Sequence, residues 1–166
     1  MVTTLAAGCS HAKPVANLTF SEIKKVTRAY EIKFSSDINL DALFNPDADE
    51  KVVARRLICA LEDDHDFSVK HSLDRYYRSE FTAIAAVPSS PPGRFHYLAK
   101  SDFYETFDED ASRQHITDEA LRKLLSGKKT IPCKVVMTVY MKQPYYSATM
   151  LIPAEDILKQ IPLSRP

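Results

Sequence analysis

The sequence predicts an α+β fold in which one antiparallel sheet carries two main helices packed on one face. Three observations predict this class. Segments with strand-like alternation follow one another along the chain, without the regular strand–helix–strand order of parallel sheets. Two segments carry helix start signals ahead of apolar residues at helical spacing. The chain has 166 residues, 45% hydrophobic and 27% charged, which suits one globular domain.

The first predicted elements are a strand and a long helix. Tyr30, Ile32 and Phe34 alternate with charged or polar residues, as in a half-buried strand. The preceding residues 19–26 fit a helical turn or the start of a longer strand. A helix is expected over 46–61, because Asn45 is a suitable N-cap and proline and acidic residues follow it. Its apolar positions would be Val52, Val53, Leu57, Ala60 and Leu61.

The middle of the chain predicts further strands. Residues 67–73 alternate between apolar and polar. Residues 74–87 fit both a strand and a helix, and a strand is favoured because β-branched and aromatic residues are enriched there. Residues 88–93 form a proline-rich loop, and Phe95 and Tyr97 predict a short strand after it. Residues 101–116 show no clear period.

The last third predicts a helix, a hairpin and a short closing helix. Thr117 is a suitable N-cap for the second main helix, and Gly127 is a suitable stop. Residues 131–152 alternate on both sides of a turn at 142–144, which predicts a hairpin. A short helix is expected at 154–160. The sequence therefore predicts a single α+β domain over 19–163.

Residues 5–9, Leu-Ala-Ala-Gly-Cys, resemble the lipobox of bacterial lipoproteins, where small residues precede a cysteine that is lipidated after cleavage. The resemblance implies that residues 1–8 are the remnant of a signal peptide and that Cys9 carries the lipid. Ser10 then points to the outer membrane, with the domain on the periplasmic side. Residues 9–18 are small and polar, which suits a flexible tether.

The cysteine count leaves two alternatives. Lipidation of Cys9 would leave Cys59 and Cys133 as the remaining pair. The two could form a disulfide in an oxidising compartment. They could equally be separate buried thiols, because a free cysteine packs as a small apolar residue.

Composition argues against several classes of function. The chain carries 22 basic and 22 acidic residues, and the basic ones occur only in short pairs such as Arg55–Arg56, which are interpreted as solvated faces. A nucleic-acid partner is therefore not expected. The glycines at 8, 93 and 127 form no phosphate-binding loop. Neither a cofactor nor a metal is expected.

Two local features remain as candidate sites. Residues 62–66, Glu-Asp-Asp-His-Asp, suit either a site for a cation or a basic partner, or a solvated loop. The pairs Tyr76–Tyr77 and Tyr145–Tyr146 lie in predicted strands, where neighbouring side chains face opposite sides. One ring of each pair must then face outward or be covered by another element. Outward rings would form an interaction surface.

These observations favour a membrane-anchored envelope lipoprotein domain with a binding or accessory role rather than a catalytic one. Its partner would be another envelope protein or a cell-wall component, and its membrane contact would be the lipid anchor. The alternative is a small periplasmic hydrolase or metal-dependent enzyme that uses residues 62–66.

The anchor can be tested directly. In a bacterial host, labelled palmitate is expected to enter the full gene product and to be lost in Cys9→Ala, because the lipid is attached to that cysteine. Incorporation that persists in Cys9→Ala would contradict the assignment.

Overall fold

The computed structural model describes residues 12–44, 50–86, 91–107 and 112–162. In these ranges, strands pair antiparallel throughout into one ten-stranded sheet. The strands are β1 Leu18–Val26, β2 Ala29–Ser36, β3 Val52–Ala60, β4 Arg75–Ile84, β5 Phe95–Ser101, β6 Phe103–Phe107, β7 Ser112–His115, β8 Thr130–Val139, β9 Tyr145–Tyr146 and β10 Met150–Pro153. The helices are α1 Asp118–Leu125 and α2 Ala154–Leu158.

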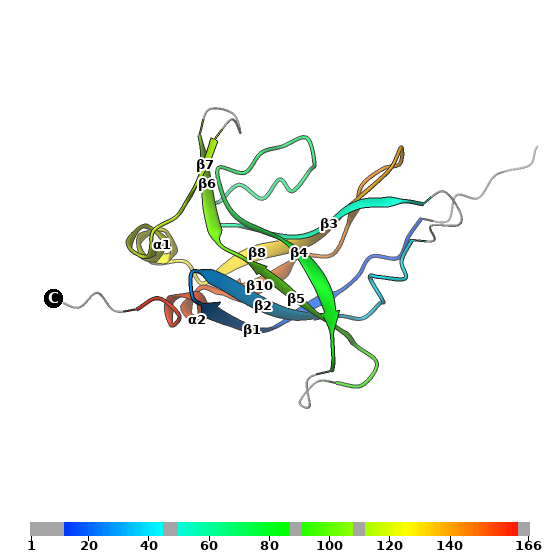
Figure 1. Ribbon diagram of the computed structural model, residues 1–166, viewed down its shortest axis with the longest axis horizontal. Coiled ribbons are helices and arrows are strands. Elements are labelled where there is room, and N and C mark those ends of the chain that lie inside the picture. The colour runs from blue at the N-terminus through cyan, green and yellow to red at the C-terminus, as the bar shows by residue number, and fades with distance from the viewer. Residues whose placement is uncertain (1–11, 45–49, 87–90, 108–111, 163–166) are drawn as a thin grey trace, which may run out of the picture.

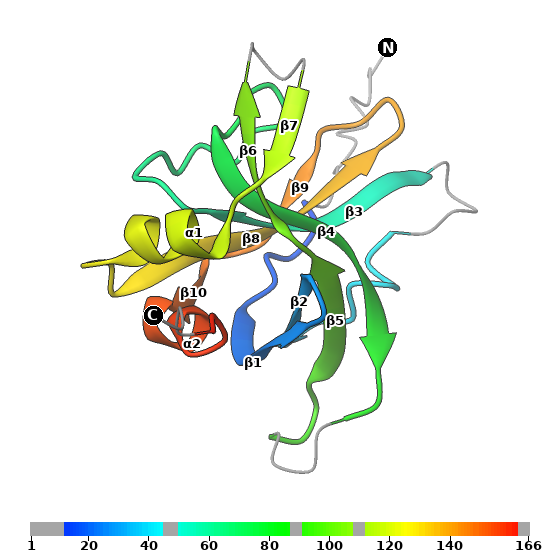
Figure 2. The same cartoon turned by 60° about the vertical axis from the view of Figure 1, so that its left-hand side comes forward.

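The sheet curls around a single main core. Its strand order is β1-β2-β5-β4-β3-β8-β10, and the two end strands β1 and β10 contact each other (Figure 2). Buried side chains from both halves of the sheet, including Tyr30, Phe34, Leu57 and Ile131, belong to one cluster. Helix α2 lies against β1, β8 and β10 and adds the buried Ile157 to that cluster (Figure 1).

The predicted α+β class is wrong. Strands account for 49% of the chain and helices for 9%, so this is a β-rich fold and not a sheet with two main helices packed on it. The larger error is the helix expected over 46–61. Residues 45–49 lie outside the described ranges, and 52–60 form strand β3.

The second half of β3 lacks an alternating pattern because residues 57–60 are buried on both faces of the sheet. Leu57 and Cys59 point into the main core, whereas Ile58 and Ala60 belong to a second cluster on the outer face of the sheet. A run of buried residues on both faces cannot be told from a buried helix by periodicity. The helix start signal at Asn45 then favoured a helix over the strand that forms.

The segment that covers the outer face is 61–74, which joins β3 to β4. Residues 67–73 were expected to form a strand, but they have no strand structure. Phe67 and Leu73 instead pack on Ile58, Tyr76 and Val136. The Leu61 N–H donates to the Arg75 carbonyl at 3.0 Å, so the two ends of the segment are held together. The apolar–polar alternation of 67–73 therefore does not mark a strand, because Phe67 and Leu73 are buried while Val69 between them is 50% exposed.

Other local expectations are confirmed. Strands β2, β4 and β5 occupy the predicted segments, and residues 19–26 belong to β1. Thr117 caps α1 by accepting from the Ala120 N–H, and Gly127 follows the helix with a φ of 84°. The 131–152 hairpin forms as β8 with β9 and β10, and the short helix is α2. The β6–β7 hairpin was missed, because the β7 residues are all exposed and therefore show no period.

The N-terminal segment is held closer than a flexible tether over 9–18 would be. Residues 9–11 lie outside the described ranges. Ala16 is fully buried, its N–H donates to the Tyr145 hydroxyl at 2.7 Å, and its carbonyl accepts from the Ala148 N–H at 2.9 Å. The Tyr145 hydroxyl in turn donates to the Pro14 carbonyl at 3.1 Å. The chain is therefore fixed to the domain from about Pro14 onward.

Cys59 and Cys133 form a disulfide. They are directly opposite each other in the β3–β8 ladder, with a Cα–Cα separation of 4.0 Å and an S–S distance of 2.08 Å. Both residues are fully buried in the main core. The bond crosslinks β3 to β8 across a sequence separation of 74 residues.

Removing this crosslink is expected to destabilise the protein. The variant Cys59→Ala with Cys133→Ala should lose about 2–5 kcal/mol of unfolding free energy in urea titrations followed by circular dichroism. Either single change breaks the same bond, so each should cost nearly as much as both. If the free-energy losses of the two single variants added up to the loss of the double variant, side-chain packing and not the disulfide would account for the stabilisation.

Candidate anion-binding groove

The sheet opens where β4 changes its partner. Residues 81–84 of β4 pair with β5, and 75–77 pair with β6, whereas 78–80 pair with neither. The Ser79 hydroxyl fills this gap, lying 3.0 Å from the Lys100 N–H and 2.9 Å from the Lys100 carbonyl oxygen. The opening therefore leaves the Lys100 backbone polar groups satisfied while β5 and β6 diverge.

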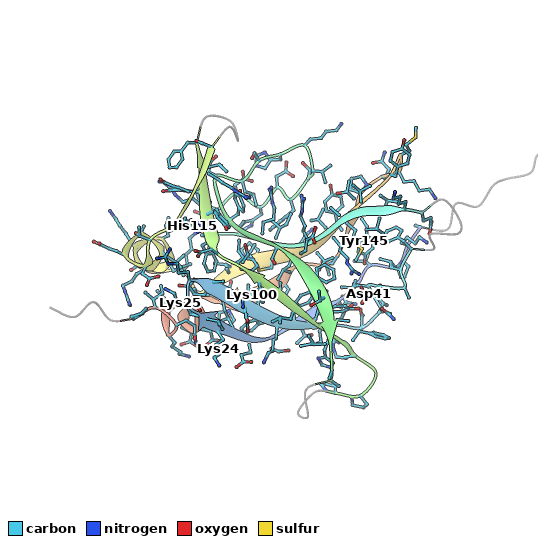
Figure 3. All side chains as sticks on the ribbon, in the orientation of Figure 1. Lys24, Lys25, Asp41, Lys100, His115 and Tyr145 are labelled. Atoms are coloured by element: carbon cyan, nitrogen blue, oxygen red, sulfur yellow. A yellow bond between two sulfur atoms is a disulfide. The ribbon has the colours of Figure 1, made fainter. Side chains whose placement is uncertain are left out.

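An open groove of about 610 Å³ lies at this point. Four cationic side chains line it: Arg56 from β3, Arg78 from β4, Lys100 from β5 and Arg113 from β7. Figure 3 shows Lys100 over the middle of the sheet. Glu80 is the acidic residue among the described residues that line the groove. The groove is therefore strongly basic in a chain whose net charge is zero.

Three of these cations have no ionic partner in the described part of the chain. No carboxylate lies within 4.0 Å of Arg56, Arg78 or Arg113 there, whereas Lys100 pairs with Glu31 at 3.0 Å. Arginines elsewhere are bound: Arg55 to Asp41, and Arg75 to Glu62 and Glu105. Arg94 and Arg122 also lack a carboxylate partner, but both donate hydrogen bonds to uncharged oxygens. The exposed Arg28 of the β1–β2 turn is the other described arginine with neither kind of contact. Half of the described arginines without a carboxylate partner therefore lie in the groove.

Aromatic rings hold two of the guanidinium groups. The Arg78 guanidinium lies 4.6 Å from the centre of the Tyr76 ring, and that of Arg113 lies 5.1 Å from the centre of the Tyr104 ring. Stacking on a ring orients a guanidinium without using its N–H donors. The buried Arg78 Nε has no hydrogen-bond partner in the described residues. The arrangement therefore leaves donors available to an anionic ligand.

Arg56 and Arg78 also border a second, smaller hollow of about 290 Å³ beneath the 61–74 segment. It is lined by His71, whose Nε2 lies 2.5 Å from an Asp64 oxygen, and by Asp66. The two arginines thus stand on the boundary between the covered and the open parts of the outer sheet face.

The acidic residues 62–66 do not converge on one point. Glu62 pairs with Arg75, and Asp63 pairs with Lys128 at 2.7 Å. Asp64 accepts from the Asp66 N–H at 2.9 Å, and Asp66 accepts from the Ser68 N–H at 2.8 Å. In the ranges that the structure describes, no three His, Cys, Asp or Glu side chains are grouped to hold a metal ion.

Of the four tyrosines expected to offer an interaction surface, Tyr77 and Tyr145 face the main core, as alternation predicts for one ring of each pair. Tyr76, Tyr77 and Tyr145 are buried, and Tyr146 is half-buried. Tyr76 does face out of the sheet, but it is covered by the 61–74 segment and by Tyr104. Tyr76 is therefore covered by other elements of the protein, and its ring packs against the Arg78 guanidinium instead of contacting a partner.

Sequence reasoning missed the groove arginines. The Arg55–Arg56 pair was interpreted as a solvated face, but its two side chains point in opposite directions. Arg55 binds Asp41, whereas Arg56 lines the groove with Arg78. One sequence signal could have linked Arg78 to the site: it follows Tyr76 by two residues, so the two side chains lie on the same face of the strand. The predicted lipid attachment residue, Cys9, lies outside the described ranges.

The hydrogen bonds of the 61–74 segment predict a pH dependence of stability. Backbone N–H donors, from Asp66 to Asp64 and from Ser68 to Asp66, hold the pKa of each carboxyl below its ordinary value of 3.8. Each carboxylate therefore stabilises the fold above about pH 4 and ceases to do so as pH falls through the lowered pKa. Asp64→Asn with Asp66→Asn should lower the melting temperature at pH 7, and the difference from the wild type should shrink as the pH is lowered from 4 to 2.

Asp74→Asn is the matched control, because no hydrogen bond to the Asp74 side chain is seen in the described chain. Its melting temperature should follow that of the wild type over the same pH range. A double variant that melts with the wild type at pH 7 would contradict the assigned role of these carboxylates.

No protein family, curated protein or solved structure matches this chain. Among the described residues, no helix is both long enough and apolar enough to cross a membrane. The function of the groove therefore has to be argued from its own side chains.

Proposed function

We propose that this protein is a non-catalytic binding domain of the cell envelope, anchored through Cys9, that takes an acidic segment of a partner protein in its basic groove. The observation that carries the proposal is the set of three groove arginines, Arg56, Arg78 and Arg113, without carboxylate partners in the described chain. Arginine N–H donors match carboxylates in a two-pronged geometry, so an acidic ligand would complete their hydrogen bonding.

The shape of the groove favours a peptide over a small anion. The groove is open to solvent and combines its cations with apolar surface from Leu98 and the rings of Tyr76 and Tyr104. A small anion needs an enclosed set of donors, whereas a peptide uses charge and apolar contact together along an open surface. Glu80 at the edge would discriminate against segments with too many carboxylates.

Two further observations support a location in the envelope. Residues 5–9 resemble a lipobox, which would place a lipid on Cys9. The other two cysteines form a disulfide, and disulfides persist mainly in oxidising compartments such as the periplasm. Both features agree with a partner that is another envelope protein.

The alternative of a hydrolase or metal-dependent enzyme at residues 62–66 has no supporting contact. Each carboxylate of that stretch is engaged by its own neighbour, as described above. Cys59 and Cys133 are joined in the disulfide, so neither of them offers a thiolate nucleophile.

Binding of a fluorescently labelled glutamate-rich peptide, measured by anisotropy, tests the proposal. Arg56→Gln with Arg78→Gln should weaken binding by about tenfold or more, because each hydrogen bond to a charged group contributes over 1 kcal/mol. Lys24→Gln with Arg28→Gln removes the same charge from exposed residues of β1 and its turn, and should change affinity little.

Three outcomes would contradict the proposal. Equal losses in both double variants would show that binding follows net charge and not the groove. If a glutamine-rich peptide bound as tightly as the glutamate-rich one, the peptide carboxylates would have no role in binding. Tight competition by inorganic phosphate would identify the groove as a phosphate site and not a peptide site. A thermal melt of each variant separates binding loss from unfolding.

A further inference from the structure

Four large apolar side chains are exposed at one end of the molecule. Met141 is 88% exposed, Tyr140 and Val53 are each 62% exposed, and Val15 is 59% exposed. We name these four residues the apolar tip. They come from the β8–β9 turn, the start of β3 and the N-terminal segment, which lie at the right-hand end of Figure 1. Tyr145, labelled at this end in Figure 3, fixes the N-terminal segment there.

Backbone contacts bring two of the three segments together. Val52 pairs with Val139 at the end of the β3–β8 ladder, and the Tyr140 N–H donates to the Lys51 carbonyl at 2.9 Å. Val53 and Tyr140 therefore lie at the same end of the sheet. Val15 lines a hollow of about 780 Å³ with Lys142 of the turn.

Met141 occupies a position that its side chain does not suit. The turn from Val139 to Lys142 is closed by a 3.3 Å hydrogen bond, and Met141 at its third position has a φ of 51°. Glycine or asparagine is favoured at such a position, because a larger side chain crowds the left-handed backbone. The Met141 side chain gains no packing there, because it is almost fully exposed. Strain that yields no internal contact indicates an external one.

Lysines surround the apolar tip. Lys51 precedes Val53, and Lys13 and Lys142 lie on either side of Glu50, at 2.7 and 3.5 Å from its carboxylate oxygens. Lysine stems cover apolar surface while their ammonium groups stay in water. This combination of exposed apolar side chains and bordering lysines is typical of surfaces that rest in a membrane interface.

The occupant of this surface follows from where the chain continues. Ala12 lines the hollow beside Val15, and Cys9 is three residues earlier. Three residues span at most about 11 Å, so a lipid on Cys9 would be attached within that distance of Ala12. A lipid on Cys9 would hold this same end of the molecule against a bilayer.

We infer that the apolar tip docks on the surface of a lipid bilayer, inserting Tyr140 and Met141. The inference does not depend on the groove, and it adds a direct contact of the folded domain to the anchor. Because Glu50 binds both Lys13 and Lys142 and offsets their charge, apolar insertion and not attraction to anionic lipid drives the docking. Zwitterionic vesicles should therefore bind as well as vesicles that contain anionic lipid.

The test uses the full chain carrying Cys9→Ser, so that no lipid is attached. Sedimentation with phosphatidylcholine vesicles measures the fraction bound. Tyr140→Asp with Met141→Asp should reduce vesicle partitioning at least tenfold, because each large apolar side chain removed from water contributes about that factor. Leu151→Asp, which places the same charge at a 56% exposed apolar residue of β10, should bind as the parent does.

Met141→Gly separates docking from a structural role. Glycine suits the left-handed turn position, so this variant should melt no lower than the parent while binding vesicles more weakly. Loss of folding in Met141→Gly, or equal vesicle binding by parent and tip variants, would overturn the inference. So would a parent that does not bind vesicles, or a tip that instead forms dimers in light scattering. Failure of palmitate labelling at Cys9 would refute the anchor alone.

Discussion

Strand β3 lies between β4 and β8, and its residues 57–60 are buried on both faces. Leu57 and Cys59 enter the main core, and Ile58 and Ala60 lie under the 61–74 segment. The disulfide from Cys59 to Cys133 ties the strand to β8 at the level of the core. Because β3 connects both layers, the two hydrophobic clusters are stabilised by the same backbone ladder.

The cover over β3 also determines where the groove lies. The 61–74 segment buries the outer face from Ala60 to Ile58 and stops at Arg56 and Arg78. At that boundary residues 78–80 of β4 pair with neither β5 nor β6, and the groove lies open over them. The arginines thus border a buried layer on one side and solvent on the other. Their charges remain hydrated at one edge, while Tyr76, held in the covered layer, orients Arg78.

The groove and the apolar tip occupy different parts of the molecule and share no residue. Lys100 marks the groove over the middle of the sheet, and Tyr145 marks the end where the tip lies (Figure 3). A domain resting on a bilayer through the tip would keep the groove open to a partner. Anchoring and ligand capture are therefore geometrically compatible.

The sequence by itself determined the elements whose signals are local. Thr117 and Gly127 bound helix α1, and alternation located β2 and β5, because a cap or a half-buried strand is encoded within a few neighbouring residues. The tertiary structure alone decided β3, the 61–74 cover and the grouping of the groove arginines. A strand covered on both faces shows no alternation, and Arg56, Arg78 and Arg113 meet only because strand pairing brings distant segments into register.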